Sequence, residues 1–352
     1  MRTTTRIYDQ ARTDLVASAL GLLAIGGLYT DGWAHVNIGG LESFFTPWHA
    51  VLYGSFTVLV AWIAVSIWRR HQAASSWTDA IPPGYGLGLA GIVIFALGGI
   101  LDMVWHTIFG VEVGVDALVS PTHLVLLTGA ALLLSSPIRS ALQATPRPDG
   151  THPWAPVLGV ASVAALAVFF LSYLSVFTDP LSTLPMTHIP EGAPGHQSAE
   201  LPAVAGLGGY LVTTLLLVLP VDFLRRTGRL PAGSVFLVVA AVAVPAAALS
   251  EFTYVWPLVG ALVAGALVDV IGRNWSRSIL GPVMVGTVWA GQLTGLATMG
   301  DLRWPIELWA GVTVLSMMLA LIVSLIIRDP VSWSVTGGSA STSVVPSRSI
   351  DP

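Results

Sequence analysis

The chain has 352 residues, of which 54% are hydrophobic and only 10% are charged, and its mean hydropathy is +0.77. This composition excludes a water-soluble globular protein and indicates a polytopic membrane protein. The net charge of -4 provides no basic surface for nucleic acid, and the lack of cysteine excludes disulfides, thiolate catalysis and cysteine-ligated metal sites. Any metal must therefore be bound by His, Asp, Glu or Met side chains.

Ten apolar segments are long enough to cross a bilayer as helices, because a hydrocarbon core of about 30 Å needs roughly 20 residues. We expect these helices at residues 13–35, 48–69, 83–108, 121–143, 155–177, 202–224, 230–250, 254–272, 277–300 and 305–328. Between the seventh and the eighth, residues 251–253 alone must form the turn. The predicted fold is all-α, with about ten transmembrane helices.

The arginines predict how these helices are oriented, because positively charged loops stay on the cytoplasmic side. Arginines precede the first segment and occupy every second connection, whereas Arg303 alone lies in an outer connection. We therefore expect a plasma (inner) membrane protein with both termini in the cytoplasm and no cleaved leader. The expected parts are a cytoplasmic N-terminus (1–12), a four-helix region (13–143), six further helices (144–328) with an outer loop at 178–201, and a disordered cytoplasmic tail (329–352).

Two stretches of the four-helix region, residues 26–53 and 98–126, share one order of polar residues. Each contains an Asp, a His four positions later, a Glu, and then a hydroxyl residue, a Pro and a second His. The matched residues are Asp31, His35, Glu42, Thr46, Pro47 and His49 in the first stretch, and Asp102, His106, Glu112, Ser120, Pro121 and His123 in the second. Because each stretch crosses outward and returns, the pattern predicts a parallel repeat of two helical hairpins.

This spacing predicts that each hairpin gathers three metal ligands at its outer end. An Asp and a His four apart share one face of a helix, and a Pro favours the first turn of the returning helix that carries the second His. The predicted ligands of a mononuclear or dinuclear site are Asp31, His35, His49, Asp102, His106 and His123. Such ligands suit copper, zinc or iron, with Glu42 and Glu112 as general bases or further ligands. Alternatively, each Asp only accepts hydrogen bonds that tie its hairpin together.

This Asp-x3-His motif is followed by a second His about thirteen or fourteen residues later. It resembles a motif in the C subunit of the copper membrane monooxygenases, that is, the particulate methane and ammonia monooxygenases. Asp31, His35 and His49 match it residue by residue, and the second stretch matches it with three extra loop residues, so that about a hundred residues are covered. The resemblance implies copper within the membrane, monooxygenase-like oxidoreductase activity and a redox partner in the membrane or periplasm. The ten expected helices exceed that subunit's usual number.

Polar residues of the expected outer loop, and two other classes of function, are also compatible with the sequence. In the outer loop, Met186, His188, His196 and Glu200 could deliver a soft cation, but we expect them to be solvated. A proton- or metal-coupled transporter is the second candidate function, and it predicts polar residues through the membrane midplane, which several expected helices lack. An intramembrane zinc hydrolase, similar to the alkaline ceramidase and progestin-receptor superfamily, is third, because its His-x3-His helix is absent.

Overall fold

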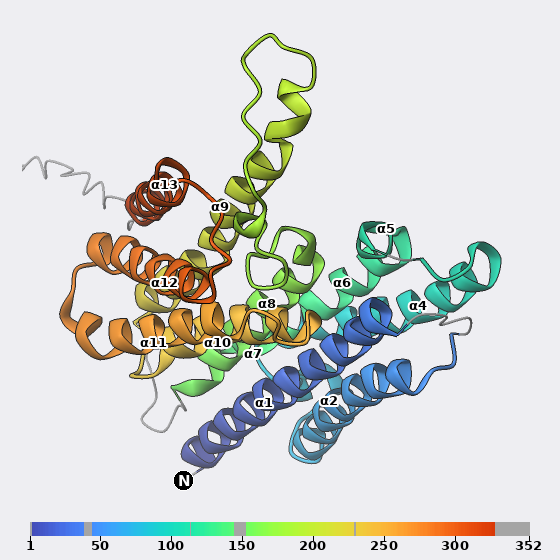
Figure 1. Ribbon diagram of the computed structural model, residues 1–352. Coiled ribbons are helices and arrows are strands. Elements are labelled where there is room, and N and C mark those ends of the chain that lie inside the picture. Colours follow the sequence, from blue (N-terminus) through green and yellow to red (C-terminus); the bar gives the residue numbers. More distant parts are fainter. Residues whose placement is uncertain (1, 39–43, 113, 144–152, 229, 328–352) are drawn as a thin grey trace, which may run out of the picture.

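The computed structural model describes residues 2–38, 44–112, 114–143, 153–228 and 230–327, and every regular element in these ranges is a helix (Figure 1). The helices are α1 (Arg2–Asn37), α2 (Pro47–His71), α3 (Trp77–Ala80), α4 (Gly86–Phe109), α5 (Val115–Val119), α6 (Pro121–Leu134), α7 (Ser136–Gln143), α8 (Trp154–Phe170), α9 (His196–Arg226), α10 (Ser234–Leu249), α11 (Val255–Ile271), α12 (Arg277–Met299) and α13 (Ile306–Ile326), with short 3-10 turns at Ser172–Leu174, Leu181–Thr183 and Gly272–Asn274. Within these ranges, eight helical segments are long and apolar enough to cross a membrane. Helices α8 and α10 are also apolar, but have only 17 and 16 residues.

The helices follow the segments expected from hydropathy, with three differences at their ends. Helix α1 begins at Arg2, well before residue 13, because hydropathy marks the apolar part of a helix and not its polar extension. Helix α8 ends at Phe170 rather than near 177, where the chain turns into the 3-10 segment. Helix α9 begins at His196, after Gly195 with a φ of 88°, so the last residues of the expected outer loop are helical.

The tight turn expected at residues 251–253 is present. Glu251 and Phe252 both adopt left-handed backbone conformations, with φ values of 52° and 57°. The Phe252 amide donates a hydrogen bond to the Ala247 carbonyl at 2.9 Å, which ends α10. Such non-glycine residues cost on the order of 1 kcal/mol each, and the packing of α11 against α10 on either side of the turn compensates.

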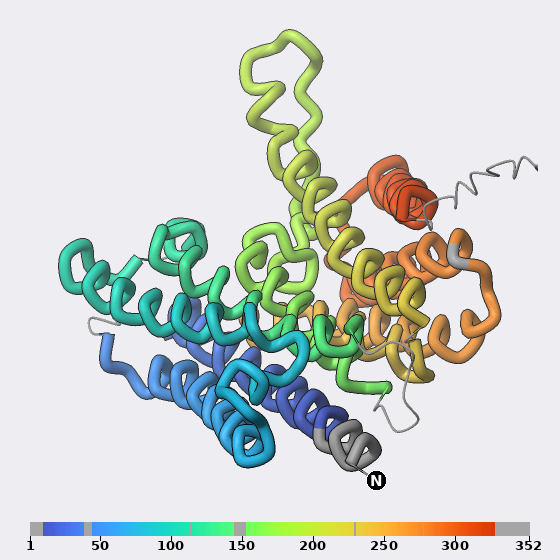
Figure 2. Tube along the Cα trace, turned by 180° about the vertical axis from the view of Figure 1, so that it is seen from behind, coloured from blue at the N-terminus to red at the C-terminus, as the bar shows by residue number. Residues whose placement is uncertain are grey.

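Small residues let the helices approach closely, as is usual in membrane proteins. A Cβ atom added to Gly260 of α11 would lie 2.1 Å from the Gly291 carbonyl oxygen of α12, and one added to Gly91 of α4 would lie 2.6 Å from that of Gly129 in α6. The α1/α2 and α4/α6 pairs each form an antiparallel hairpin, and both views show the two hairpins next to each other (Figures 1 and 2).

A buried polar cluster joins these hairpins near the N-terminal end of α1. The Asp14 carboxylate accepts hydrogen bonds from Gln10 (2.8 Å), from Tyr85 (2.9 Å) and from Ser140 of α7 (2.7 Å), and Arg70 of α2 donates to Gln10. We call Gln10, Asp14, Arg70, Tyr85 and Ser140 the basal cluster.

Candidate metal centre

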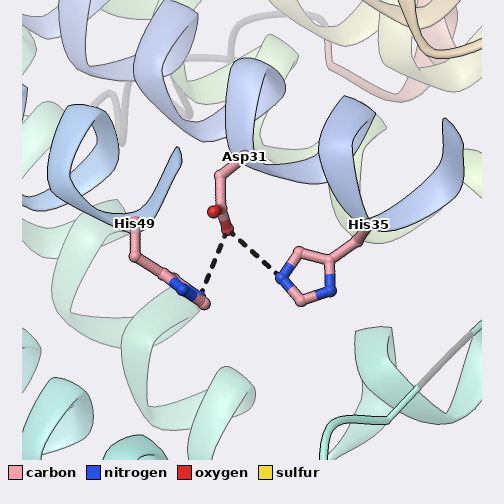
Figure 3. Close-up of side chains that lie close together, drawn as sticks. All are labelled: Asp31, His35 and His49. Atoms are coloured by element: carbon pink, nitrogen blue, oxygen red, sulfur yellow. Dashed lines mark ion pairs between the residues drawn. The ribbon is translucent and has the colours of Figure 1, made fainter. Parts of the chain in front are cut away.

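The first triad lies at the opposite end of the hairpins, where α1 ends and α2 begins. Asp31 Oδ2 is 3.8 Å from His35 Nε2 and 3.7 Å from His49 Nε2, and the three side chains point toward one another (Figure 3). Asp31 and His49 are buried, and His35 is partly exposed. One ligand atom from each residue lies within 4.8 Å of the others, so the triad could hold a metal ion.

Local sequence explains how His49 reaches Asp31. Thr46 caps α2 by accepting a hydrogen bond from the His49 backbone amide at 3.1 Å, and Pro47 occupies the first turn, where a missing N–H is tolerated. The Thr46 hydroxyl also lies 3.1 Å from His49 Nδ1. The ring is thereby fixed with Nε2 directed at Asp31.

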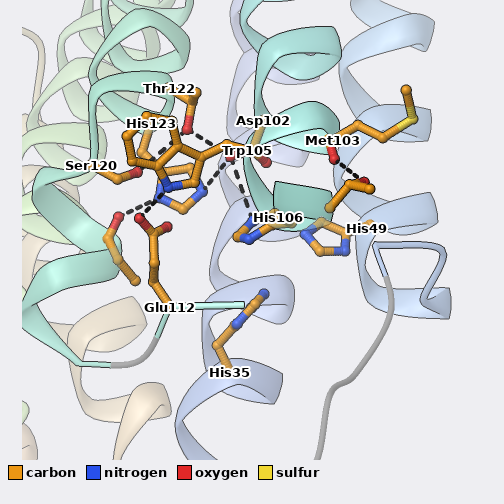
Figure 4. A network of polar contacts seen from close by, with 12 residues as sticks. His35, His49, Asp102, Met103, Trp105, His106, Glu112, Ser120, Thr122 and His123 are labelled. Carbon is orange, nitrogen blue, oxygen red and sulfur yellow. Dashed lines mark hydrogen bonds and ion pairs between the residues drawn. The ribbon is translucent and has the colours of Figure 1, made fainter. Parts of the chain in front are cut away.

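The second triad has the same layout, with Asp102 and His106 near the end of α4 and His123 as the third residue of α6 (Figure 4). It is more tightly bonded than the first. Asp102, only 1% exposed, has its Oδ1 atom 3.0 Å from His123 Nε2 and 3.5 Å from His106 Nε2, and accepts a hydrogen bond from the Thr122 hydroxyl at 2.9 Å. Its ligand atoms also lie within 4.8 Å of one another.

Backbone carbonyls determine which imidazole nitrogen of each histidine in this triad carries a lone pair that could bind a metal ion. His106 Nδ1 lies 3.2 Å from the Gly110 carbonyl oxygen, and His123 Nδ1 contacts that of Ala117. A carbonyl can only accept, so both Nδ1 atoms donate, and Nε2 of each neutral ring presents its lone pair to Asp102. A proton or a metal ion must therefore bridge Nε2 and the carboxylate, and donation from Nδ1 to a carbonyl is the usual arrangement around a metal-bound His.

Both triads face one cavity of about 580 Å³. Its walls include Asp31, His35, His49, Asp102 and His123, from four different helices. The ring centres of His49 and His106 are 6.4 Å apart, which brings the triads into direct contact, and Figure 4 shows His35 and His49 beside the second triad. The six residues expected as ligands thus gather in one place.

Several buried polar atoms in or beside this cavity make no hydrogen bond in the described structure. Within the described ranges, no hydrogen bond reaches Asp31 Oδ1, His106 Nε2, Tyr53 Oη or Glu112 Oε2. The other carboxylate oxygen of Glu112 accepts a hydrogen bond from the Trp105 indole at 2.6 Å. An unsatisfied buried polar group costs roughly 1–3 kcal/mol, and a bound ion or ligand removes that cost. Tyr53 was not among the residues expected at the site, although it lies four residues after His49 on the same helical face.

The remaining expected residues are distributed differently. Glu112 lines the cavity, whereas Glu42 lies outside the described residues. His196 and His188 do not line the cavity. His196 Nδ1 lies 2.7 Å from the Ile189 carbonyl oxygen, and its Nε2 lies 3.9 Å from Glu200, in the segment that projects furthest from the helices in Figure 1.

Each triad offers one carboxylate oxygen and two imidazole nitrogens, a ligand set that suits zinc, copper or non-haem iron and leaves coordination positions open. The buried carboxylates and the Nε2 atoms that converge on them fit such an ion. In comparisons with known proteins, no family model, no curated protein and no solved structure matches the chain.

Proposed function

We propose that this chain is an integral membrane metalloprotein that binds one transition-metal ion in each triad. The observation that carries the proposal is that two largely buried Asp-His-His triads, each with its ligand atoms within 4.8 Å of one another, face the same cavity. The buried Asp31 Oδ1 atom, which accepts no hydrogen bond in the described structure, supports it, because a purely structural cluster would satisfy its buried groups.

We further propose copper as the metal, with zinc and iron as alternatives, and an oxidoreductase activity. The Asp-x3-His motif and its resemblance to the copper membrane monooxygenase C subunit support this choice. Two ions with open positions in a shared cavity are suited to activating water or dioxygen. Glu112 is placed to act as a base or a further ligand, and electrons would come from a partner in the membrane or periplasm.

The proposed topology has ten crossings, with α8 and α10 added to the eight longer segments. At 1.5 Å per residue these two helices are about 25 Å long, somewhat shorter than a hydrocarbon core of about 30 Å. Their burial supports the assignment, because Val157, Val238 and Val242 have no exposed surface and the neighbouring helices shield both helices from lipid. Cytoplasmic termini, a location in the plasma membrane, and a parallel repeat of α1/α2 and α4/α6 complete the proposal.

The polarity of the cavity lining favours some of the alternative functions over others. A proton- or metal-coupled transporter needs polar groups that continue past the triads. The described lining deeper in the bundle is apolar, however, and includes Phe56, Phe95 and Ala130. We therefore place transport second and an intramembrane zinc hydrolase third.

Elemental analysis of purified protein tests the proposal. After anaerobic reconstitution, we expect about two equivalents of metal in the wild type, about one in His35→Ala and in His106→Ala, and none in the double variant. His188→Ala is the matched control, since this exposed histidine lies outside the cavity, and it should keep both ions. Failure of copper, zinc and iron to bind the wild type, or full binding by the double variant, would contradict the proposal.

A further inference from the structure

The cavity extends well beyond the triads, toward the basal cluster. Phe95 lies seven residues before Asp102, Phe56 lies seven after His49, and Ala130 lies seven after His123. Seven residues are two helical turns, so each lies on its ligand's helical face and about 10 Å deeper in the bundle. Phe95, Phe56 and Ala130 all line the cavity, which thus has a metal-binding end and a deep end.

The deep end is apolar. Phe56 and Phe95 stack with ring centres 4.1 Å apart and planes within 13° of parallel, which closes the gap between α2 and α4. The lining on the deep side of the triads also includes Leu28, Leu52, Leu126, Leu127 and Leu166. A volume of about 580 Å³ far exceeds the roughly 30 Å³ share of a water molecule in the liquid, so two ions and their waters would fill only part of it. The remaining space matches an apolar chain.

The metal-binding end favours an oxygen ligand. The carboxylates of Asp31, Asp102, Glu112 and Asp179 line the cavity, and their four negative charges would balance those of two divalent ions without filling all the coordination positions. Each ion, with three protein ligands, would also have an open position for an oxygen atom. Tyr53 supplies a donor: its buried hydroxyl lines the cavity without a partner in the described structure, and its ring centre is 6.3 Å from that of His49.

We propose, on the basis of the two metal sites proposed above, that the cavity binds an anionic amphiphile of the fatty-acid class. Its carboxylate ligates the metal ions and accepts a hydrogen bond from Tyr53, and its chain lies in the deep end beside Phe95 and Ala130. This class combines an oxygen ligand and an apolar body in one membrane-dissolved molecule. The two ends of the cavity thus recognise the two ends of a single ligand.

Titration of cobalt-substituted protein in nanodiscs tests the proposal, with dodecanoate and acetate as probes and the visible ligand-field bands of Co(II) as the readout. We expect dodecanoate to shift the bands at a concentration at least tenfold lower than acetate. Tyr53→Phe should weaken both probes about tenfold, the size expected for a hydrogen bond to a charged group. Ala130→Leu and Leu127→Phe, which fill the deep end, should weaken dodecanoate at least tenfold and leave acetate unchanged.

Thr128→Leu is the matched control, because it adds bulk to an exposed position of the same helix outside the cavity, and it should change neither titration. Metal content is measured first in every variant, and two bound ions establish that the site is folded. Two bound ions with no response to dodecanoate, or with equal responses to both probes in all variants, would overturn this inference alone. Failure of the wild type to bind metal would overturn the metal sites and the inference together.

Discussion

The two triads differ in how their carboxylates are bonded, and this difference predicts unequal losses of stability when each carboxylate is removed. Asp102 accepts a hydrogen bond from Thr122 at 2.9 Å and lies 3.0 Å from His123 Nε2, whereas Asp31 Oδ1 has no partner and its Oδ2 is at least 3.7 Å from either histidine. Hydrogen bonds to charged groups contribute roughly 1.5–3 kcal/mol each. In metal-free protein, Asp102→Ala should therefore lower the free energy of unfolding by about 3–5 kcal/mol.

Asp31→Ala should cost less than about 1 kcal/mol in the same metal-free protein, because it breaks no hydrogen bond and removes a poorly satisfied buried carboxylate. The two variants delete the same atoms from buried positions, so the loss of packing largely cancels between them. Chemical unfolding of metal-free protein in detergent, followed by circular dichroism, measures both values. Both variants should lose one metal equivalent when reconstituted. An Asp31→Ala cost equal to or above that of Asp102→Ala would refute this reasoning.

Three further perturbations act at separate places. Gly260→Ala should lower the free energy of unfolding by about 1–3 kcal/mol, because the added methyl group overpacks against α12. Gly208 has open space around it, so Gly208→Ala should change the free energy of unfolding little, and thermal unfolding compares the two variants. Ser140→Ala removes the hydrogen bond from Ser140 to Asp14 and the one from Gln10 to Ser140, and should lower the free energy of unfolding by about 2–4 kcal/mol. The metal content should stay at the wild-type value, since seventeen residues of α1, about 25 Å, separate Asp14 from Asp31; unfolding and elemental analysis of one sample test both expectations. Removal of the metal with a chelator should lower the melting temperature of the wild type, because an ion at a free concentration of a hundred times its Kd stabilises the fold by about 2.7 kcal/mol. The same treatment should leave the melting temperature of the His35→Ala/His106→Ala double variant unchanged.

Local patterns predicted the parts of the site that lie within one hairpin. The four-residue spacing of Asp31 and His35 placed them on one helical face, and Pro47 and Pro121 correctly indicated where the returning helices begin. The turn at Glu251 was also expected, because only three residues separate two apolar segments there. These features depend on helical periodicity and on the backbone preferences of proline, both of which are local.

Features that depend on packing between hairpins could not be predicted in this way. The approach of His49 to His106 arises from the passage of α2 beside α4, for which no local pattern exists. In the sequence, Tyr53 is one aromatic residue among others in an apolar helix. Only the packing of the helices places its hydroxyl in the cavity without a hydrogen-bond partner in the described structure. The early end of α8 at Phe170 was missed because the apolar run continues through the 3-10 turn to Phe177.

Each triad is built from the two helices of a single hairpin, so two ions bound as proposed would share no ligand. The distance between the two ions would then depend on how closely the two hairpins approach each other. Tyr53 of α2 packs against Gly99 of α4, where an added Cβ atom would lie 2.9 Å from the tyrosine ring. A methyl group at position 99 would therefore widen the intermetal distance without touching any ligand.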